Sequence, residues 1–275
     1  MSATSPRMRA AVLGSPITHS LSPALHRAAY RALGLDWTYE AIEVDEASIA
    51  SFIANLDDAW AGLSLTMPLK ESVIGLLNEV DPLASATASV NTVLPCRSGW
   101  RGTNTDIYGM TQALRVAGLR GSPRSGLILG AGATARSALA ALADLGSRHV
   151  LLSARRAEAA VALIPTARSF GLVPEAVEWE AGSSAALDRL RMVEVTISTV
   201  PEGAGAAWAE HGRTATGALL DAAYHPWPTP LAAAWAGSVI ASGRDMLLWQ
   251  AVEQVRLMTG LPAPVAAMRE ALPDS

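Results

Sequence analysis

The sequence predicts an α/β protein of two domains. Short apolar runs with the length of buried strands alternate with segments that have the apolar spacing of helices, and this alternation is typical of an α/β layer. The alternation starts again near Thr105, and 275 residues suffice for one or two domains. We therefore expect one domain over residues 1–106 and 244–275, and a second over residues 107–243.

The first half opens with a short buried strand over 10–13, which a Gly-Ser-Pro sequence ends. Ser22 is expected to cap a helix that has Pro23 at its first position and stops at Gly34. Further strands are expected over 39–44, 62–66 and 90–95, and further helices over 47–55 and after Pro68.

The second half begins with a helix over 107–117 and a Gly/Ser/Pro-rich loop over 118–125. A strand over 126–129 leads into a glycine-rich turn, and the helix that follows runs to Leu145, where Gly146 stops it. A strand over 149–153 completes a βαβ unit of about thirty residues. Two more strands are expected over 194–199 and 218–222, and helices over 246–260 and 265–272.

Composition excludes several classes of protein. The net charge of −4 argues against nucleic acid or an anionic membrane as the main partner. The single cysteine, Cys96, excludes internal disulfides and cysteine-based metal clusters and fits a reducing compartment, and we expect no metal. There is no targeting segment and no apolar stretch of membrane-spanning length, so we expect a soluble, cytoplasmic protein.

The turn at residues 130–135, Gly-Ala-Gly-Ala-Thr-Ala, fits the dinucleotide-binding pattern G-x-G-x-x-G/A. Gly130 permits the tight turn, Gly132 lets the backbone approach a pyrophosphate, and the small Ala135 lets the helix pack on the strand. The predicted strand before it and helix after it are the required context. An ordinary strand–turn–helix in an alanine-rich chain remains the alternative.

The end of the next strand indicates which dinucleotide is bound. An NAD site usually places a carboxylate there for the ribose 2′-hydroxyl, whereas this chain has Ala154, Arg155 and Arg156 and no carboxylate before Glu158. Guanidinium groups bind a 2′-phosphate through forked donors. The sequence therefore favours NADP, unless the two arginines merely end a strand in an arginine-rich protein.

Polar residues gather at the predicted strand ends of the first half. Ser20 and Ser22 precede a helix N-terminus, which suits a carboxylate, although a helix cap is an equally simple explanation. Lys70 is the only lysine among 21 basic residues, and its proton affinity can be tuned in a way that arginine does not allow. With Asp106 it would form an acid/base pair, although Asp106 also suits a helix cap. Thr66 and Asn91 are expected near the same strand ends.

Seven segments stand out in order along the chain: GSPITHSLSP at 14–23, LTMPLK at 65–70, VNT at 90–92, GTNTD at 102–106, STVP at 198–201, DAAYHP at 221–226 and GRDMLLWQ at 243–250. Together with the glycine-rich turn they resemble the motifs of the shikimate dehydrogenase family. The resemblance covers residues 10–260, which is nearly the whole chain.

The resemblance implies a reversible, NADPH-dependent reduction of 3-dehydroshikimate to shikimate, on the route to chorismate and the aromatic amino acids. It implies an N-terminal α/β substrate domain and a Rossmann-type NADP-binding domain flanking a cleft, in a monomer or homodimer. Lys70 and Asp106 would be the catalytic pair. The implied substrate-binding residues are Ser20, Ser22, Thr66, Asn91, Asp106, Tyr224 and Gln250. The implied cofactor-binding residues are Gly130, Ala131, Gly132, Ala133, Thr134, Ala154, Arg155, Arg156, Thr199, Ala222, Gly243 and Met246.

A few positions depart from the family pattern. Ser64 stands where the family often has Asn, Ala133 replaces a common glycine, and residues 154–156 replace a usual Asn-Arg-Thr. Asp245 replaces a frequent glycine, and it lies near the proposed nicotinamide site or caps the helix that starts at Met246.

Three other functions remain open. A quinate/shikimate dehydrogenase using NAD(H) is the nearest, and the pair Ser20 and Ser22 favours shikimate over quinate. A non-catalytic NADP-binding regulator is argued against by the presence of both Lys70 and Asp106. A dinucleotide-dependent folate enzyme is disfavoured by the two-serine site.

Overall fold

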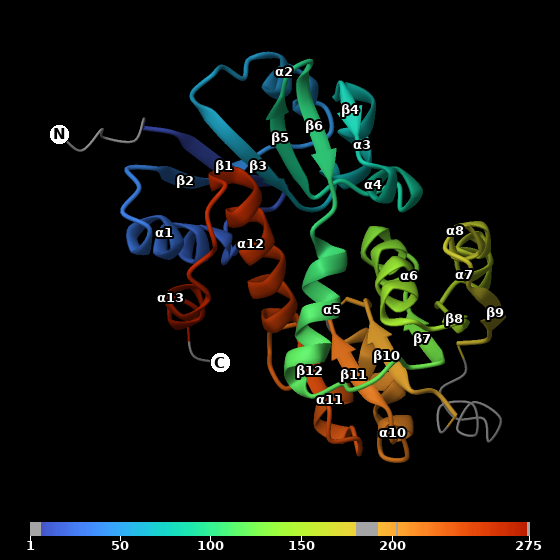
Figure 1. Ribbon diagram of the computed structural model, residues 1–275. Coiled ribbons are helices and arrows are strands. Elements are labelled where there is room, and N and C mark those ends of the chain that lie inside the picture. The colour runs from blue at the N-terminus through green and yellow to red at the C-terminus, as the bar shows by residue number, and fades with distance from the viewer. Residues whose placement is uncertain (1–6, 180–191, 202, 274–275) are drawn as a thin grey trace. The chain divides into compact units, whose positions relative to one another are not determined.

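The computed structural model describes residues 7–179, 192–201 and 203–273. The chain forms two compact units, each with a six-stranded sheet (Figure 1). Unit 1 takes in the described residues of Met1–Thr105 and Gln250–Asp274, and unit 2 consists of the described residues of Asp106–Trp249. The α/β class predicted from the sequence is thus confirmed. Among the described residues, no helix combines the length and the apolar character needed to cross a membrane.

The sheet of unit 1 is mixed and has the order β2-β1-β3-β5-β6-β4. β1 (Arg9–Gly14) runs parallel to β2 (Thr38–Glu43) and β3 (Trp60–Leu65). β5 (Thr92–Cys96) pairs antiparallel with both β3 and β6 (Gly99–Thr103). The two-residue strand β4, Glu79–Val80, forms one edge beside β6.

Helices cover both faces of this sheet, which explains the continuous apolar run in β1. Ala11 and Leu13 pack with Ile49 and Ile53 of α2 in one core. On the other face α1 and the end of α12 (Gly243–Thr259) lie against the sheet, where the hydroxyl of Ser64 on β3 donates to Gln254. The helices of unit 1 are α1 (Ser22–Ala32), α2 (Ile49–Ala54), α3 (Leu69–Ser72), the 3₁₀ turn η1 (Ile74–Leu76), α4 (Pro82–Ala86) and α13 (Val265–Glu270).

The sheet of unit 2 is entirely parallel, with the order β12-β11-β10-β7-β8-β9. Counted within the unit from β7, this is the strand order 3-2-1-4-5-6 read from β9, the order of a doubly wound dinucleotide-binding fold. The strands are β7 (Ser125–Leu129), β8 (His149–Ser153), β9 (Val173–Val177), β10 (Val195–Ser198), β11 (Ala218–Asp221) and β12 (Ile240–Ser242).

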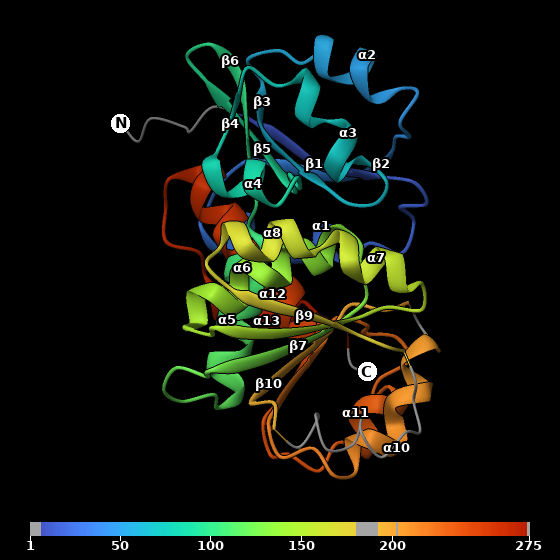
Figure 2. The ribbon, with the colours of Figure 1, turned by 90° about the vertical axis from the view of Figure 1, so that its right-hand side faces the viewer.

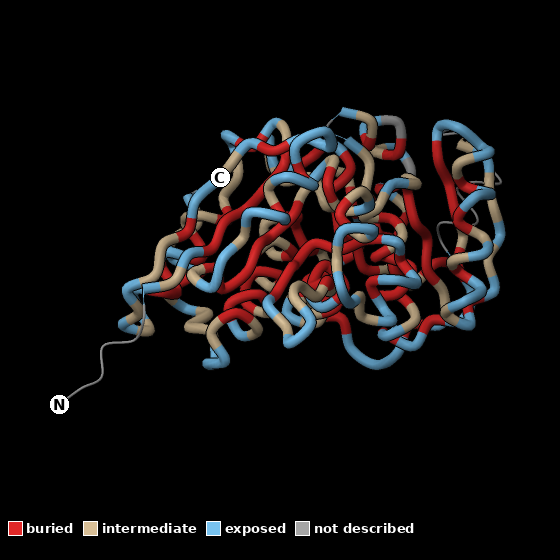
Figure 3. Tube along the Cα trace, turned by 90° about the horizontal axis from the view of Figure 1, so that it is seen from above, coloured by how far each residue is buried: buried red, intermediate tan, exposed pale blue. Residues whose placement is uncertain are grey.

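The helices of unit 2 lie on opposite faces of its sheet (Figure 2). α5 and α6 bury Met110, Leu114 and Leu139 against one face, and η2, α10 and α11 bury Trp208 and Leu231 against the other. Buried residues form the interior stretches of the chain in Figure 3. The helices are α5 (Asp106–Ala117), α6 (Ala133–Leu145), α7 (Ala157–Ala162), α8 (Ile164–Ser169), η2 (Ala204–Trp208), α10 (Ala209–Gly212), α11 (Pro230–Ala234) and α12 (Gly243–Thr259).

One predicted cap is wrong. Ser22 is the first residue of α1 and its side chain makes no capping bond; the residue before the helix is Leu21. Ser20 takes over part of that role, because its hydroxyl oxygen accepts a hydrogen bond from the N–H of Ser22 at 3.4 Å. Pro23 does lie in the first turn, as its fixed φ favours.

Short elements escaped prediction. Elements of two to six residues are too short for a hydrophobic period to be recognised in the sequence. These are the strands β4, β6, β9 and β12 and the helices α4, α7 and α8. The last long helix begins at Gly243, three residues earlier than expected. Its start is fixed by Ser242, whose N–H and hydroxyl both donate to Asp245.

Candidate active site

The glycine-rich turn lies directly between β7 and α6. Gly130 has φ +109°, a conformation that favours glycine, and a Cβ there would collide with Thr199. Its N–H donates to the carbonyl of Ser153 on β8 at 2.8 Å, which ties the turn to the neighbouring strand. Local backbone geometry therefore requires the first glycine of the motif.

Gly132 is a glycine for a different reason. It precedes α6, has φ −84° and makes no side-chain capping bond to the helix. A Cβ built on it would meet no atom within 4 Å, so nothing in the protein forbids a side chain at this position. The open space lies at the N-terminus of a helix of thirteen residues, where backbone N–H groups and the helix dipole favour an anion. This region fits a dinucleotide pyrophosphate.

The rest of the turn belongs to the start of α6. Ala133 and Thr134 are its first two residues and are half-buried. Ala131 packs against the apolar core of unit 2, and Ala135 is fully buried, which agrees with the packing role expected of it.

The order of the strands places the crevice of the unit next to this turn. Strands β7 and β10 are neighbours although they are not consecutive in the chain, so the strand order reverses between them. In open sheets ligands bind beyond the carboxyl ends of strands at such a point. Thr199 follows β10 there, and its hydroxyl donates to the carbonyl of Leu129 at 2.9 Å.

The strand β8 ends in the basic residues predicted to meet a 2′-phosphate. Ala154 is buried, whereas Arg155 and Arg156 are exposed. The first carboxylate after the strand is Glu158, inside α7. Two accessible guanidinium groups without a competing carboxylate in the turn fit a phosphate better than a ribose 2′-hydroxyl.

The carboxyl end of β11 contributes a second close approach. A Cβ on Gly243 would collide with the backbone of Ala222, so this glycine lets the start of α12 lie against the end of β11. Tyr224 follows in the loop after β11 and is half-buried. Met246 is buried in the core of unit 2, which makes it a packing residue in this structure.

Sequence reasoning missed the residue that holds this loop. Asp221, at the end of β11, is buried, and its carboxylate accepts hydrogen bonds from the Thr229 hydroxyl at 2.6 Å and the Ala223 N–H at 3.4 Å. Thr229 also caps α11 by accepting from the N–H of Ala232. Burial raises the pKa of the Asp221 carboxyl above its usual value. Asp221 is part of the segment DAAYHP singled out in the sequence, but its hydrogen bond to Thr229 is seen only in the folded structure.

Asp245 is part of a helix cap. Its carboxylate accepts from the N–H and the hydroxyl of Ser242 at 3.0 and 2.7 Å, and the Ser242 hydroxyl accepts from the Asp245 N–H at 3.2 Å. This reciprocal arrangement is a capping box. Asp245 therefore takes part in a cap, but as the third residue of a helix that starts at Gly243 and follows the cap residue Ser242, and not as the cap of a helix that starts at Met246.

In unit 1 the two predicted carboxylate-binding serines lie at the start of α1. Ser20 is half-buried and Ser22 is buried. Behind them the Nδ1 of His26 donates to the carbonyl of Ser22 at 3.0 Å, and the His26 ring stacks on Tyr39 at a centroid distance of 3.9 Å. Burial lowers the pKa of His26 to about 4, so this imidazole is neutral at pH 7.

The sole lysine is placed by a short connection. Thr66 follows β3, and α3, which carries Lys70, starts three residues later. The carbonyl of Lys70 accepts from the N–H of Val90 at 2.8 Å, which ties the lysine backbone to the segment that carries Asn91. Thr66 and Lys70 are both half-buried.

Asn91 is buried within a dense set of polar contacts. Its Oδ1 accepts from the N–H of Thr105 and the hydroxyl of Thr92, both at 2.8 Å. Its Nδ2 donates to the Thr105 hydroxyl at 3.0 Å and lies 3.5 Å from Oε1 of Gln250. The structure thus brings Asn91 and Gln250 together, as the predicted site requires.

Asp106, the predicted partner of Lys70, is the first residue of α5 and is buried. It follows Thr105 directly in the chain, and Thr105 is the residue whose N–H binds Asn91. Asp106 belongs to unit 2 and Lys70 to unit 1.

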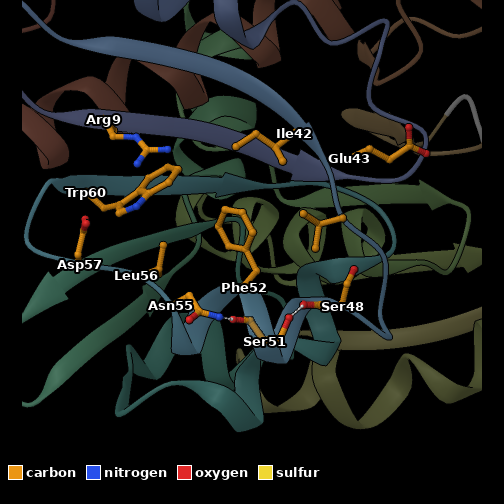
Figure 4. A pocket seen from close by; sticks show the side chains of 11 residues that line it. Arg9, Ile42, Glu43, Ser48, Ser51, Phe52, Asn55, Leu56, Asp57 and Trp60 are labelled. Atoms are coloured by element: carbon orange, nitrogen blue, oxygen red, sulfur yellow. Dashed lines mark hydrogen bonds between the residues drawn. The ribbon is translucent and has the colours of Figure 1, made fainter.

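A hollow elsewhere in unit 1 contains none of the predicted site residues. It has a volume of about 420 Å³ and lies between the end of β2 and α2 (Figure 4). Two of its polar side chains already have partners: Arg9 stacks over the Trp60 ring at 4.4 Å, and Asn55 donates to the carbonyl of Ser51 at 2.7 Å. The hollow is therefore not the candidate active site.

Comparison with known proteins agrees with these features. A family model described as the shikimate dehydrogenase substrate binding domain matches residues 12–93, and one described as the shikimate 5'-dehydrogenase C-terminal domain matches residues 243–272. A shikimate dehydrogenase (NADP(+)) of Thermosynechococcus vestitus is 33% identical over 272 residues, which cover 95% of this chain and 93% of the relative.

Solved structures show the same likeness. The shikimate dehydrogenase of Mycobacterium tuberculosis is 41% identical with a TM-score of 0.89, covering 96% of this chain and 98% of the other. The shikimate 5-dehydrogenase of Thermus thermophilus, solved in complex with NADP(H) and shikimate, is 32% identical with a TM-score of 0.82, covering 96% and 98%. These similarities extend over nearly the full length of each relative, and the chain belongs to the shikimate dehydrogenase family.

Proposed function

We propose that this protein catalyses the reversible, NADPH-dependent reduction of 3-dehydroshikimate to shikimate, a step toward chorismate and the aromatic amino acids. The observation that carries the proposal is the tie between Lys70 and the segment of Asn91, through the Val90 hydrogen bond. It ties the backbone of the residue that carries the only lysine ammonium to a segment with buried polar groups that suit a hydroxylated substrate.

Lys70 acts on the carbonyl oxygen. When bound, NADPH supplies the hydride that reduces the carbonyl carbon of the ring. Negative charge develops on the oxygen as that carbon is reduced, and the Nζ of Lys70 stabilises the charge and then donates a proton to the oxygen. The carbonyl becomes a hydroxyl and Lys70 becomes a neutral amine, which solvent reprotonates. In the oxidation of shikimate the neutral amine accepts the hydroxyl proton. Asp106 orients the substrate and the lysine.

The other polar residues hold the substrate in this proposal. Ser20 and Ser22 bind its carboxylate through hydroxyls and backbone N–H groups at the start of α1. The ring hydroxyls are contacted by Thr66, Asn91, Asp106, Tyr224 and Gln250. Neutral donors and acceptors at a buried site discriminate strongly against a ligand that lacks the matching hydroxyl, because the site groups are then left unpaired.

NADPH binds at unit 2. The N–H groups at the start of α6, residues 131–134, hold the pyrophosphate, and Arg155 and Arg156 hold the 2′-phosphate. Thr199, Ala222 and Gly243 line the remaining path of the cofactor, while Met246 supports it from the core. We further propose a cytoplasmic enzyme that is a monomer or a homodimer.

One assay tests the proposal. Purified protein is incubated with NADP⁺ or NAD⁺, each with shikimate or quinate, and the absorbance of the reduced cofactor is followed. The expected result is turnover with NADP⁺ and shikimate at a kcat/KM at least about tenfold above the other three combinations, the factor that 1.4 kcal/mol of discrimination produces. Preference for quinate with NAD⁺ would make the chain a quinate dehydrogenase. Turnover with neither substrate would leave only a cofactor-binding role.

A further inference from the structure

We propose that a buried chain of hydrogen bonds from Tyr39 to Asn91 orients the Asn91 amide, and that Ser64 and Gln254 are positioning residues for the substrate. This inference rests on the proposed function, in which Asn91 contacts a ring hydroxyl of shikimate. It assigns a role to two residues of unit 1 that lie outside the predicted site.

The chain links β2, β3, α12 and β5. The Tyr39 hydroxyl donates to Oγ of Ser64 at 2.7 Å, and the Ser64 hydroxyl donates to Oε1 of Gln254 at 2.8 Å. Nε2 of Gln254 donates to Oγ1 of Thr92 at 2.9 Å, and the Thr92 hydroxyl donates to Oδ1 of Asn91 at 2.8 Å. Each of the five residues is at most 4% exposed, so the whole chain is shielded from water.

Two backbone groups fix the direction of the bonds that reach Asn91. Nε2 of Gln254 also lies 3.2 Å from the carbonyl of Asn91, which can only accept, so the NH₂ group of Gln254 must face it. Thr92 must then accept from Gln254, and its single proton goes to Oδ1 of Asn91 at 2.8 Å, because the other acceptor within reach, Oγ1 of Thr105, is farther away at 3.3 Å. Independently, the N–H of Thr105 can only donate, and it is 2.8 Å from the same Oδ1 of Asn91.

The consequence concerns the chemistry that Asn91 offers. With Oδ1 held by the two donors, the NH₂ group of Asn91 is turned toward Thr105 and Gln250. The contact to Gln250 is long at 3.5 Å, so a substrate hydroxyl can replace it, and Asn91 then acts toward that hydroxyl as a donor. Removing Gln254 leaves Thr92 free to reverse its hydroxyl and weakens the preference for this amide orientation.

A double-mutant cycle tests the proposal by calorimetric binding of shikimate in the presence of NADPH, which cannot oxidise it. The variants are Gln254→Leu, Asn91→Ala and the combination of the two. We expect Gln254→Leu to weaken shikimate binding about fivefold, the factor that loss of one hydrogen bond of ordinary strength produces. Binding of NADP⁺ alone should change less than about twofold. In the Asn91→Ala background, Gln254→Leu should have no further effect beyond about twofold.

Two further variants control for loss of packing and for failure of Gln254→Leu to fold. Val255→Ala truncates the fully buried neighbour of Gln254 on α12, and should lower the melting temperature without changing shikimate affinity. Ser64→Ala removes one hydroxyl of the chain with the smallest change of volume, and should weaken shikimate binding by about three- to tenfold if Gln254→Leu does not fold.

The proposal is overturned if Gln254→Leu weakens binding equally with and without Asn91, or if Val255→Ala weakens it as much as Gln254→Leu does. It is also overturned if both chain variants bind shikimate as tightly as the wild type. Failure of the proposed function has a different signature, because the wild-type protein would then bind no shikimate.

Discussion

At the scale of the residue, the proposed proton transfer depends on a lysine side chain that arginine cannot replace. Lys70 is the only lysine in a protein with 21 basic residues, and surface positions exchange lysine and arginine freely. A guanidinium stays protonated in proteins, whereas an ammonium can give up its proton. This difference makes the position of the lysine informative, and it leads to the first prediction.

Lys70→Arg should lower kcat for shikimate oxidation by at least about 10²-fold, the lower range of a lost general acid or base. Lys70→Met should lower kcat by the same factor, because neither arginine nor methionine can both accept and donate a proton at neutral pH. Steady-state kinetics with both substrates varied will measure this. The KM for NADP⁺ should stay within about twofold; near-normal kcat in both variants would show that Lys70 is not the proton donor.

Cofactor choice is the second residue-level property. Arg155→Ala and Arg156→Ala should each raise the KM for NADP⁺, because each removes a charged donor from the 2′-phosphate. The expected factor is about 10- to 150-fold, the range for a hydrogen bond to a charged group. The KM for NAD⁺ should be unchanged. Arg168→Ala on α8 removes another exposed arginine and serves as the control. Equal losses for both cofactors would place the arginines elsewhere.

His26 predicts an acid-sensitive fold. Its pKa is lowered from 6.5 to about 4 in the native state because burial disfavours the charged ring. The unfolded chain therefore binds more protons between these values, and the free energy of unfolding falls as the pH drops from 6.5 to about 4. The loss reaches about 3 kcal/mol at 1.36 kcal/mol per pKa unit.

Urea unfolding at several pH values measures this loss. His26→Phe keeps a ring against Tyr39 and should show a flatter dependence over that range. His19→Phe, at an exposed histidine, should keep the wild-type slope. The same slope in all three proteins would assign the acid sensitivity to other groups.

At the scale of the element, the ends of helices build the candidate site. α12 begins where Ser242 and Asp245 satisfy each other's backbone N–H groups. The same turn brings Gly243 against Ala222. The carboxylate of Asp245 is thus held by Ser242, directly before its own helix.

Asp245→Ala should lower the free energy of unfolding by about 1 kcal/mol, the usual cost of a lost cap. Asp245→Asn keeps an acceptor for the Ser242 N–H and should lose less than half of that. Chemical denaturation gives both numbers. The KM for NADP⁺ of Asp245→Asn should match the wild type, whereas a large decrease would mean that the carboxylate repels the cofactor.

At the scale of the whole molecule, the chain folds into two units, and each has its own apolar core. Unit 1 packs Leu13, Leu63 and Val93 into one apolar core, and unit 2 packs its residues on both faces of a parallel sheet. A ligand that binds only the native state stabilises the protein as a whole. Cofactor binding therefore has a readout that is independent of turnover.

NADP⁺ at about 100 times its Kd should raise the free energy of unfolding by about 2.7 kcal/mol. Gly132→Val should fold, because a Cβ there meets no atom within 4 Å, but it should lose this stabilisation because the side chain fills the space for the pyrophosphate. Thermal unfolding with and without NADP⁺ measures both effects. Gly75→Val, at another open glycine, is the control and should respond as the wild type does. A full response from Gly132→Val would remove this turn from the cofactor site.

Local signals explain what was predicted correctly. Residue propensity and spacing predict elements whose structure depends on residues close by in the chain. Such elements are the turn from Gly130 to Ala135, the helix that Gly146 ends and the strand before the two arginines. The short strands β4 and β12 lack that information. They form because β6 and β11 offer backbone groups along an edge that would otherwise be unpaired.

The sequence by itself determined the α/β class, the nucleotide turn and the identity of the residues that supply charge and hydroxyl groups, because each of these depends on residue type and on spacing along the chain. Only the tertiary structure decided how Asn91 is held. Gln254 lies 163 positions away from it, and Ser64 reaches Gln254 over 190. A hydrogen-bond chain of this kind has no sequence periodicity, because its members come from four separate elements that meet only when the apolar faces of the sheet and helices are buried.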